Sequence, residues 1–160
     1  MATTTEVMKN HLWLVPERWS LEDAATVPYV YSTAYLALVE KGCIRRSQYV
    51  LIHLGGTPVG QAAVAVALQH NCEVFIAISS DQQRAMFKER FPHLGNQNFV
   101  DDNSPTFHLD VLRNSDGKQM DLIFGAIAAE KLNGSLKIVE QSGVLVELGK
   151  VRPTEELGLV

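Results

Sequence analysis

The sequence predicts an α/β fold, a Rossmann-type doubly wound parallel sheet, and three observations predict it. A short apolar run over residues 49–54 ends in glycines and leads into an Ala- and Val-rich segment with helical periodicity. Further apolar runs alternate with helical segments of about 10–15 residues, which is typical of βαβ units and a parallel sheet. The run over residues 73–79 is apolar nearly throughout, as expected of a strand buried on both faces.

Composition restricts the function classes. The 160 residues suffice for one domain with a real core, and 46% apolar with 20% charged residues is ordinary for a soluble globular protein. A net charge of −4 gives no electrostatic footprint for nucleic acid or an anionic membrane, so neither partner is expected. No apolar run approaches the roughly 18 residues of a membrane span, and no secretory signal is evident.

The cysteines and histidines point away from disulfides and metals. Cys43 and Cys72 are isolated, without a C-x-x-C pattern, and no histidine pair has metal-ligand spacing. A disulfide framework and a structural zinc are therefore not expected, and the predicted location is cytoplasmic, with reduced thiols.

Two helices are expected before the first clear strand. A short strand-like run over residues 11–16 precedes a helix whose N-cap is Ser20. Pro28 is expected to interrupt that helix, because proline has no N–H to donate and clashes with the preceding turn. A second helix is predicted over residues 31–39, with Gly42 as its C-cap.

From residue 49 onwards strands and helices alternate, with right-handed crossovers between the strands. A complete doubly wound sheet of this type has six strands, and five are predicted here, so we expect the chain to stop before the last one. The predicted strands are 49–54, 73–79, 98–100, 120–124 and 143–148, and the predicted helices are 58–70, 81–91, 105–114 and 127–139.

The turn after the first strand has the outline of the G-x-G-x-x-G dinucleotide motif. Gly55 and Gly60 occupy its first and third positions, but the second is Thr57, followed by Pro58. Thr57 is a good N-cap and Pro58 an ideal first helical residue. However, Pro58 has no N–H for a phosphate, and the Cβ of Thr57 takes space that the backbone should offer to the ligand. A lost hydrogen bond to a charged group costs about 1.5–3 kcal/mol, or about 10- to 150-fold in affinity. Three alternatives therefore stay open for the cofactor pocket: seriously weakened binding, a rerouted but working pocket, and an ordinary pocket.

Several segments carry a resemblance to a known family: LWLVP (12–16), WSLEDAATVP (19–28), YSTAY (31–35), LIH (51–53), VGQAA (59–63), RFP (90–92), EKL (130–132) and VELGK (146–150). In order and spacing they resemble the enoyl reductase region of animal (type I) fatty acid synthase, in the medium-chain dehydrogenase/reductase superfamily. The resemblance implies NADPH-dependent reduction of an enoyl group carried on acyl carrier protein, within a homodimeric parent. It also implies that residues 1–16 end a preceding GroES-like substrate half and that 17–160 form the nucleotide-binding Rossmann domain.

The end of the second strand bears on the choice of cofactor. Ser79, Ser80 and Arg84 suit the 2′-phosphate of NADPH, whereas Gln83 stands where the family has a second cation. Asp81 offers the alternative of holding the ribose of NADH, but its place at a helix start favours a capping role. NADPH is therefore expected over NADH. The motif and the resemblance together assign the cofactor to Gly55, Gly56, Thr57, Val59, Gly60, Ser79, Ser80, Arg84 and Thr33.

The resemblance makes Lys150 the candidate catalytic residue, as the donor of a proton to the substrate after hydride transfer. The alternative is an exposed surface lysine just past a strand. Tyr31 and Thr33 either border the nicotinamide or simply pack within a helix. Two family positions on the ligand side are altered: Gly-Ala-Ile at 125–127 replaces Asn-Ser-Leu, and Asn103 replaces an arginine.

Other polar residues receive structural interpretations. His53 is expected to be buried or hydrogen-bonded to backbone, His93 and His108 to lie in a loop and at a helix edge, and Lys131 to lie on a solvated helix surface. The leading functional hypothesis is enoyl reduction in fatty acid synthesis, with a site whose cofactor motif is altered. The alternatives are a non-catalytic structural module of the synthase and a free-standing quinone or enone reductase.

Overall fold

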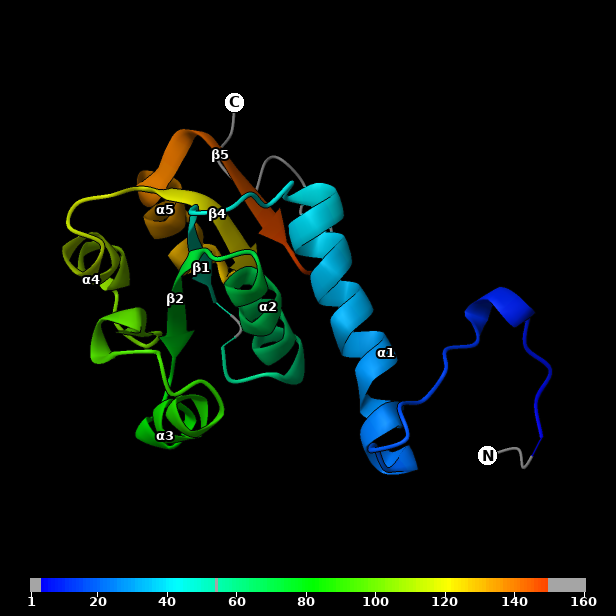
Figure 1. The fold of residues 1–160 in the computed structure, drawn as a ribbon. Coiled ribbons are helices and arrows are strands. Elements are labelled where there is room, and N and C mark those ends of the chain that lie inside the picture. The colour runs from blue at the N-terminus through cyan, green and yellow to red at the C-terminus, as the bar shows by residue number, and fades with distance from the viewer. Residues whose placement is uncertain (1–3, 54, 150–160) are drawn as a thin grey trace.

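The computed structural model describes residues 4–53 and 55–149, and Figure 1 shows their fold. A parallel sheet lies between two layers of helices. Its strands are β1 (Tyr49–Ile52), β2 (Glu73–Ile78), β3 (Phe99–Asp101), β4 (Met120–Gly125) and β5 (Val139–Glu147). The α-helices are α1 (Leu21–Tyr35), α2 (Pro58–Gln69), α3 (Asp81–Arg90), α4 (Phe107–Asn114) and α5 (Ala129–Ile138). Shorter helical turns are η1 (Lys9–His11), η2 (Leu36–Lys41) and η3 (Asn96–Asn98).

The strand order within the described residues is β3-β2-β1-β4-β5, and every neighbouring pair is parallel. This confirms the predicted Rossmann-type doubly wound sheet. The chain progresses from β1 to β3 in one direction and then crosses back to β4 and β5 in the other. In such sheets ligands bind outside the carboxyl ends of the strands at the point where the order reverses, here between β1 and β4.

The core has two parts, one on each face of the sheet. Successive residues of a strand point to opposite faces, so Val50 and Ile52 pack with α1, α2 and α3 while Leu51 packs with α4 and α5. All three side chains are fully buried. The small residues along α2, such as Ala62 and Ala63, let it approach the sheet closely. No described helix is long and apolar enough to cross a bilayer.

The prediction of two separate helices before β1 is wrong. A single helix, α1, runs through Pro28 and continues into the π-helical turn η2, which ends at the predicted C-cap Gly42. Packing of α1 along α2 sustains the helix despite the hydrogen bond that Pro28 cannot make. The hydroxyl of Ser32 donates to the carbonyl of Pro28, one turn earlier. Ser20 is the N-cap as predicted and accepts the N–H of Asp23 at 3.0 Å.

The predicted strand over residues 11–16 is also wrong. These described residues begin in the 3₁₀ turn η1 and continue as irregular backbone beyond α1, away from the sheet (Figure 1). Their pattern of apolar residues is strand-like, but no strand of the described sheet pairs with them. The prediction for the last strand placed its start at residue 143, whereas β5 begins at Val139, with an irregular register opposite Met120 and Leu122.

Candidate functional site

The glycine turn lies between β1 and α2, at the carboxyl edge of the sheet. A Cβ on Gly55 would come within 2.6 Å of the carbonyl oxygen of Ala77 and 2.5 Å of the Cγ2 of Ile76. Both atoms belong to β2, so a side chain at this position would require the neighbouring strand to shift. Glycine is therefore needed at Gly55 for close packing of the turn on the sheet, whether or not a ligand binds.

The first turn of α2 is capped by its own sequence, as the Thr-Pro pair predicts. The Oγ1 of Thr57 accepts the N–H of Gly60 at 3.1 Å, and the carbonyl of Thr57 accepts the N–H of Gln61 at 2.9 Å. Pro58 stands in the first turn and has no N–H. Within the part of the chain that the structure describes, at most the N–H of Val59 remains in this turn for a phosphate. The usual anion site at a helix N-terminus is present with fewer donors.

Gly56 contacts a side chain that the sequence did not single out for this turn. A Cβ on Gly56 would meet the carboxamide of Gln83, 2.1 Å from its Nε2 and 2.5 Å from its Cδ. The Oε1 of Gln83 accepts the N–H of Ser79 at 2.9 Å. Gln83 thus links the glycine turn to the end of β2, and no sequence motif signals this contact.

The predicted residues after β2 form a small cavity of about 210 Å³, lined by Ile78, Ser79, Ser80, Asp81, Arg84, Asp101 and Asn103. The Nε of Arg84 is buried without a hydrogen-bond partner, 3.9 Å from Asp81 Oδ1, and its guanidinium lies 5.8 Å from the Phe99 ring centroid. The side chain of Arg84 is 36% exposed and its ion pair with Asp81 is long, so the guanidinium can bind a phosphate or a ribose. However, Asp81 and Asp101 also border this cavity, and their negative charges oppose a phosphate there.

The N-cap of α3 is Ser80 and not Asp81. The hydroxyl of Ser80 accepts the N–H of Gln83 at 3.3 Å, and Asp81 is the first helical residue, with its side chain in solvent. The carboxylate of Asp81 therefore acts on the helix dipole from the first turn rather than as the cap. Asn103, which stands where the family has an arginine, donates from its Nδ2 to the carbonyl of Ser79 at 3.2 Å.

His53 and Gly125 meet where the strand order reverses. The N–H of His53 donates to the carbonyl of Phe124 at 2.8 Å, and a Cβ on Gly125 would lie 2.6 Å from the Cβ of His53. An asparagine at position 125, as in the family, would therefore need His53 to shift. Residues 125–127 are Gly, Ala and Ile, none of which has a polar side chain, and Ile127 is buried in the core. The altered segment therefore offers only backbone groups to the crevice.

The side chain of His53 belongs to a polar network beneath the carboxyl edge. Its Nε2 lies 3.0 Å from the Oγ of Ser135, and its Nδ1 lies 3.5 Å from the Oδ1 of Asp102. The Nζ of Lys131 lies 2.7 Å from the Oδ2 of Asp102. Burial opposes the ionisation of Asp102, but His53 and Lys131 outweigh it and hold the pKa of that carboxyl below its ordinary value.

This network confirms one expectation and corrects another. His53 is buried as predicted, and its ring contacts the hydroxyl of Ser135 and lies edge-on to Phe107 at 5.1 Å between centroids. Lys131 is not on a solvated surface, because its side chain is 23% exposed and forms an ion pair with Asp102. His93 is exposed in a loop, and His108 is half-buried on α4.

Two further predicted residues lie on α1. Thr33 lies on α1, where its hydroxyl donates to the carbonyl of Tyr29 at 2.7 Å, and Tyr31 is partly buried against the core. Both contacts agree with the interpretation of a packed helix. Lys150 lies outside the described residues. The described residues contain no group of three or more His, Cys, Asp or Glu that could hold a metal ion.

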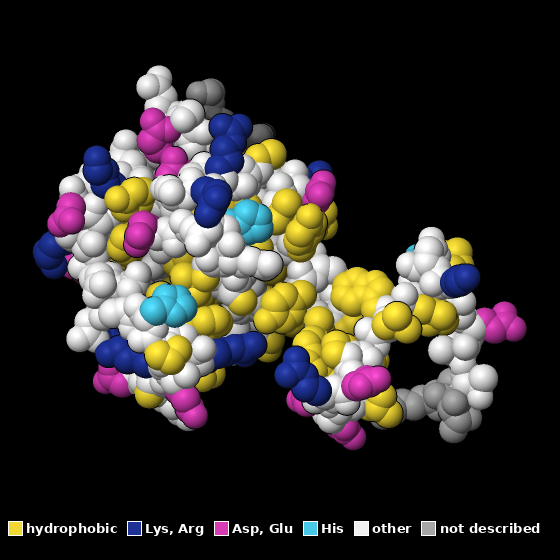
Figure 2. Space-filling view, in the orientation of Figure 1, with side chains coloured by type: hydrophobic (Ala, Val, Ile, Leu, Met, Phe, Trp, Pro, Cys, Tyr) yellow, Lys and Arg dark blue, Asp and Glu magenta, His cyan; other side chains and the backbone are white. Residues whose placement is uncertain are grey.

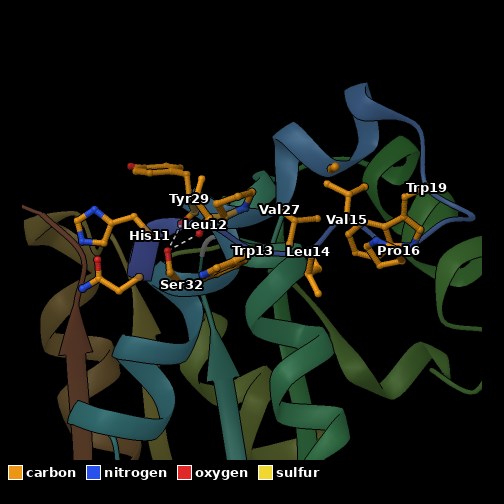
Figure 3. A pocket seen from close by; sticks show the side chains of 13 residues that line it. His11, Leu12, Trp13, Leu14, Val15, Pro16, Trp19, Val27, Tyr29 and Ser32 are labelled. Atoms are coloured by element: carbon orange, nitrogen blue, oxygen red, sulfur yellow. Dashed lines mark hydrogen bonds between the residues drawn. The ribbon is translucent and has the colours of Figure 1, made fainter. Parts of the chain in front are cut away.

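A larger cavity of about 650 Å³ lies between residues 10–16 and the first half of α1. Figure 3 shows its apolar lining, with Trp13, Val15 and Trp19 among the side chains drawn. Among the described residues, none from the glycine turn and no Asp, Glu, Lys or Arg lines this cavity. This mostly apolar lining suits hydrophobic packing.

Comparison with known proteins supports the assignment of the fold. No protein-family model matches the chain. The highly reducing polyketide synthase frbB of Dothideomycetidae sp. (strain 11243) is 34% identical over 136 residues, which are 85% of this chain and 5% of that relative. The chain thus spans about a twentieth of the length of this curated relative.

Two solved structures share the fold. The CurK enoyl reductase superposes with a TM-score of 0.77 at 26% identity, covering 89% of this chain and 42% of that protein. The nucleotide-binding subdomain of the enoylreductase domain of PpsC from Mycobacterium tuberculosis gives a TM-score of 0.68 at 27% identity, covering 81% and 74%.

These proteins point to polyketide synthases, so the finer expectation of an animal fatty acid synthase stays a prediction. Three observations agree on a nucleotide-binding fold: the glycine turn over residues 55–60, the strand order, and the similarity to these proteins. In sequence the chain is similar to polyketide synthases, and in fold it is similar to enoyl reductases and to the nucleotide-binding subdomain of one of them.

Proposed function

We propose that this chain is the cofactor-binding part of an enoyl reductase in a carrier-protein-dependent synthase. One observation carries the proposal: the glycine turn opens α2 at the carboxyl edge, where the strand order reverses between β1 and β4. Dinucleotides bind at this place in doubly wound sheets. The parent would reduce the double bond of an enoyl thioester presented on acyl carrier protein, as a homodimer, in polyketide or fatty acid synthesis.

We propose a nicotinamide dinucleotide as the cofactor, with NADPH preferred to NADH. When bound, it supplies the hydride. The backbone at Gly55 and the N–H of Val59 would hold its pyrophosphate, and Ser79 and Arg84 would hold its adenosine end. Arg84 supports NADPH, because it lines the cavity after β2 together with Ser79 and its ion pair with Asp81 is long, at 3.9 Å. The proposed proton donor is Lys150.

We propose that affinity at this site is reduced. The N–H of Gly60 donates to the hydroxyl of Thr57 and is withdrawn from the pyrophosphate, and Pro58 has no N–H to contribute. The same observation favours a second candidate, a non-catalytic module retained for its packing within the synthase. In that case the capped turn would stabilise α2 and would not bind nucleotide.

The apolar surface around the N-terminal segment supports the proposal that residues 1–16 end a substrate half. Leu14 is 99% exposed and Trp13 60%, and Figure 2 shows hydrophobic side chains gathered where this segment meets α1. Apolar area of this kind is normally covered by another part of a protein. We propose that a preceding substrate-binding half covers it.

Calorimetric titration with NADPH and then NADH tests the cofactor proposal, on chain shown by circular dichroism to be folded. The double variant Thr57→Gly/Pro58→Gly supplies a backbone N–H at position 58 and removes the Cβ atoms of both residues. We expect NADPH to bind the double variant about 10- to 150-fold more tightly than the unaltered chain. No heat from either folded protein with either nucleotide would refute cofactor binding and favour the structural module.

A further inference from the structure

Gln83 reaches back from the first turn of α3 to the end of β2. Its Oε1 accepts the N–H of Ser79 at 2.9 Å and lies 3.3 Å from the hydroxyl of the same residue. Its own N–H donates to the Oγ of Ser80, the N-cap of α3. In an ordinary capping box the third helical residue accepts the N–H of the N-cap itself. Gln83 instead reaches one residue further, to Ser79, and this brings its carboxamide to the glycine turn.

The carboxamide occupies the space beside Gly56. The three atoms nearest to a Cβ built on Gly56 are all from Gln83: Nε2 at 2.1 Å, Cδ at 2.5 Å and Oε1 at 3.0 Å. Gly55 is different, because its missing Cβ makes room for backbone and side-chain atoms of β2. The two adjacent glycines therefore have separate roles. Gly55 packs against the sheet, and the space left open by Gly56 is filled by a side chain from α3.

We propose that Gln83 is a displaceable plug of the nucleotide site. This inference rests on the proposed function and deepens it. In a glycine turn of this class the pyrophosphate approaches the backbone closely, which is possible only where nothing else contacts that backbone. With the carboxamide against Gly56, a dinucleotide reaches this part of the turn only after the Gln83 side chain turns away and releases Ser79.

The plug reduces apparent affinity by the fraction of molecules in which the turn is open. A ligand that binds only the open form has its dissociation constant divided by that fraction. Releasing Ser79 exchanges one protein hydrogen bond for water, a change that corresponds to about 2- to 12-fold in an equilibrium constant. The effect applies to any dinucleotide that uses the turn, because the contact is at Gly56 and not at the 2′-phosphate.

The test compares Gln83→Ala with the matched control Gln82→Ala. Both remove a carboxamide from the first turn of α3, but Gln82 is exposed and does not lie beside Gly56. Calorimetric titration should show Gln83→Ala binding NADPH and NADH about 2- to 12-fold more tightly than the unaltered chain. Gln82→Ala should bind both as the unaltered chain does.

A second readout needs no nucleotide. The Ser79 N–H loses its acceptor in Gln83→Ala, so its amide hydrogen exchange, followed by NMR, should accelerate, while exchange at Ser79 in Gln82→Ala stays unchanged. Alanine is a strong helix former, which favours folding of the variant, and Gln83→Ser opens the same space if Gln83→Ala does not fold.

The outcomes separate the two proposals. If the unaltered chain binds nucleotide and Gln83→Ala binds it equally or more weakly, the plug is refuted while the proposed function stands. If neither protein binds NADPH or NADH although Ser79 exchange accelerates as expected, the cofactor proposal fails and the plug with it. Unchanged Ser79 exchange in Gln83→Ala would refute the contact on which the inference depends.

Discussion

Replacing Asp102 with asparagine tests the polar network under the carboxyl edge. Asp102 lies in the loop after β3 and contacts Lys131 at 2.7 Å and His53 at 3.5 Å, with its own side chain only 25% exposed. A hydrogen bond to a charged group stabilises a protein by about 1.5–3 kcal/mol. Solvent screening lowers this value at a partly exposed site, so we expect Asp102→Asn to lower the free energy of unfolding by about 1–2 kcal/mol at pH 7.

The pH dependence of this loss has a definite sign. The folded protein lowers the pKa of Asp102, so the unfolded chain binds the proton more tightly. The stability that the carboxylate provides is therefore fully present above the ordinary Asp pKa of about 3.9, and it is lost as the pH falls through the lower folded value. The difference between the unaltered chain and Asp102→Asn should shrink in that acidic range.

Urea unfolding followed by circular dichroism, at pH 7 and at steps down towards pH 3, measures this difference. Asp110→Asn is the control, because Asp110 pairs with Arg113 at 2.8 Å on the surface, where the side chains are 34% and 75% exposed. The control should change stability by less than about 0.5 kcal/mol. An Asp102→Asn loss no larger than that of the control, or one independent of pH, would refute the role assigned to the network.

Two further outcomes follow from burial and close contact. Gly55→Ala should destabilise the fold by about 1–3 kcal/mol in urea unfolding, because its Cβ would press on the Ala77 carbonyl. Gly149→Ala should change little, because its Cβ would make an ordinary contact with Glu147 Oε1 at 3.9 Å. Equal effects of the two changes would contradict the close approach at Gly55. Cys43 is exposed, while burial raises the pKa of the Cys72 thiol, so a maleimide should label one thiol per native chain and two after unfolding. Rapid labelling of both thiols in the native state would show that Cys72 is accessible.

Most elements from β1 onwards could be predicted because their signals are local. Alternation of apolar runs with helical periodicity reports which face of each element is buried, and caps report where helices begin. The Thr57-Pro58 pair predicted the start of α2, and the structure confirms Thr57 as its N-cap. Short neighbouring segments contain all the information that these assignments require.

The errors come from places where packing outweighs local preference. Pro28 would break an isolated helix at a cost of about 3 kcal/mol, but α1 packs along α2 on its way to η2 and stays continuous. Residues 11–16 have a strand-like pattern, but no described strand lies beside them, and backbone hydrogen bonds to a neighbour are what make a strand.

The sequence alone determined the fold class, the place of the glycine turn and the capped start of α2. Only the tertiary structure decided which distant side chains meet: His53 with Ser135, 82 positions later, Lys131 with Asp102, and Gln83 with Gly56. The physical reason is that helix and strand patterns arise between neighbours a few residues apart. Contacts across the sheet's carboxyl edge instead depend on the strand order and on how closely the backbones approach, which no single segment encodes.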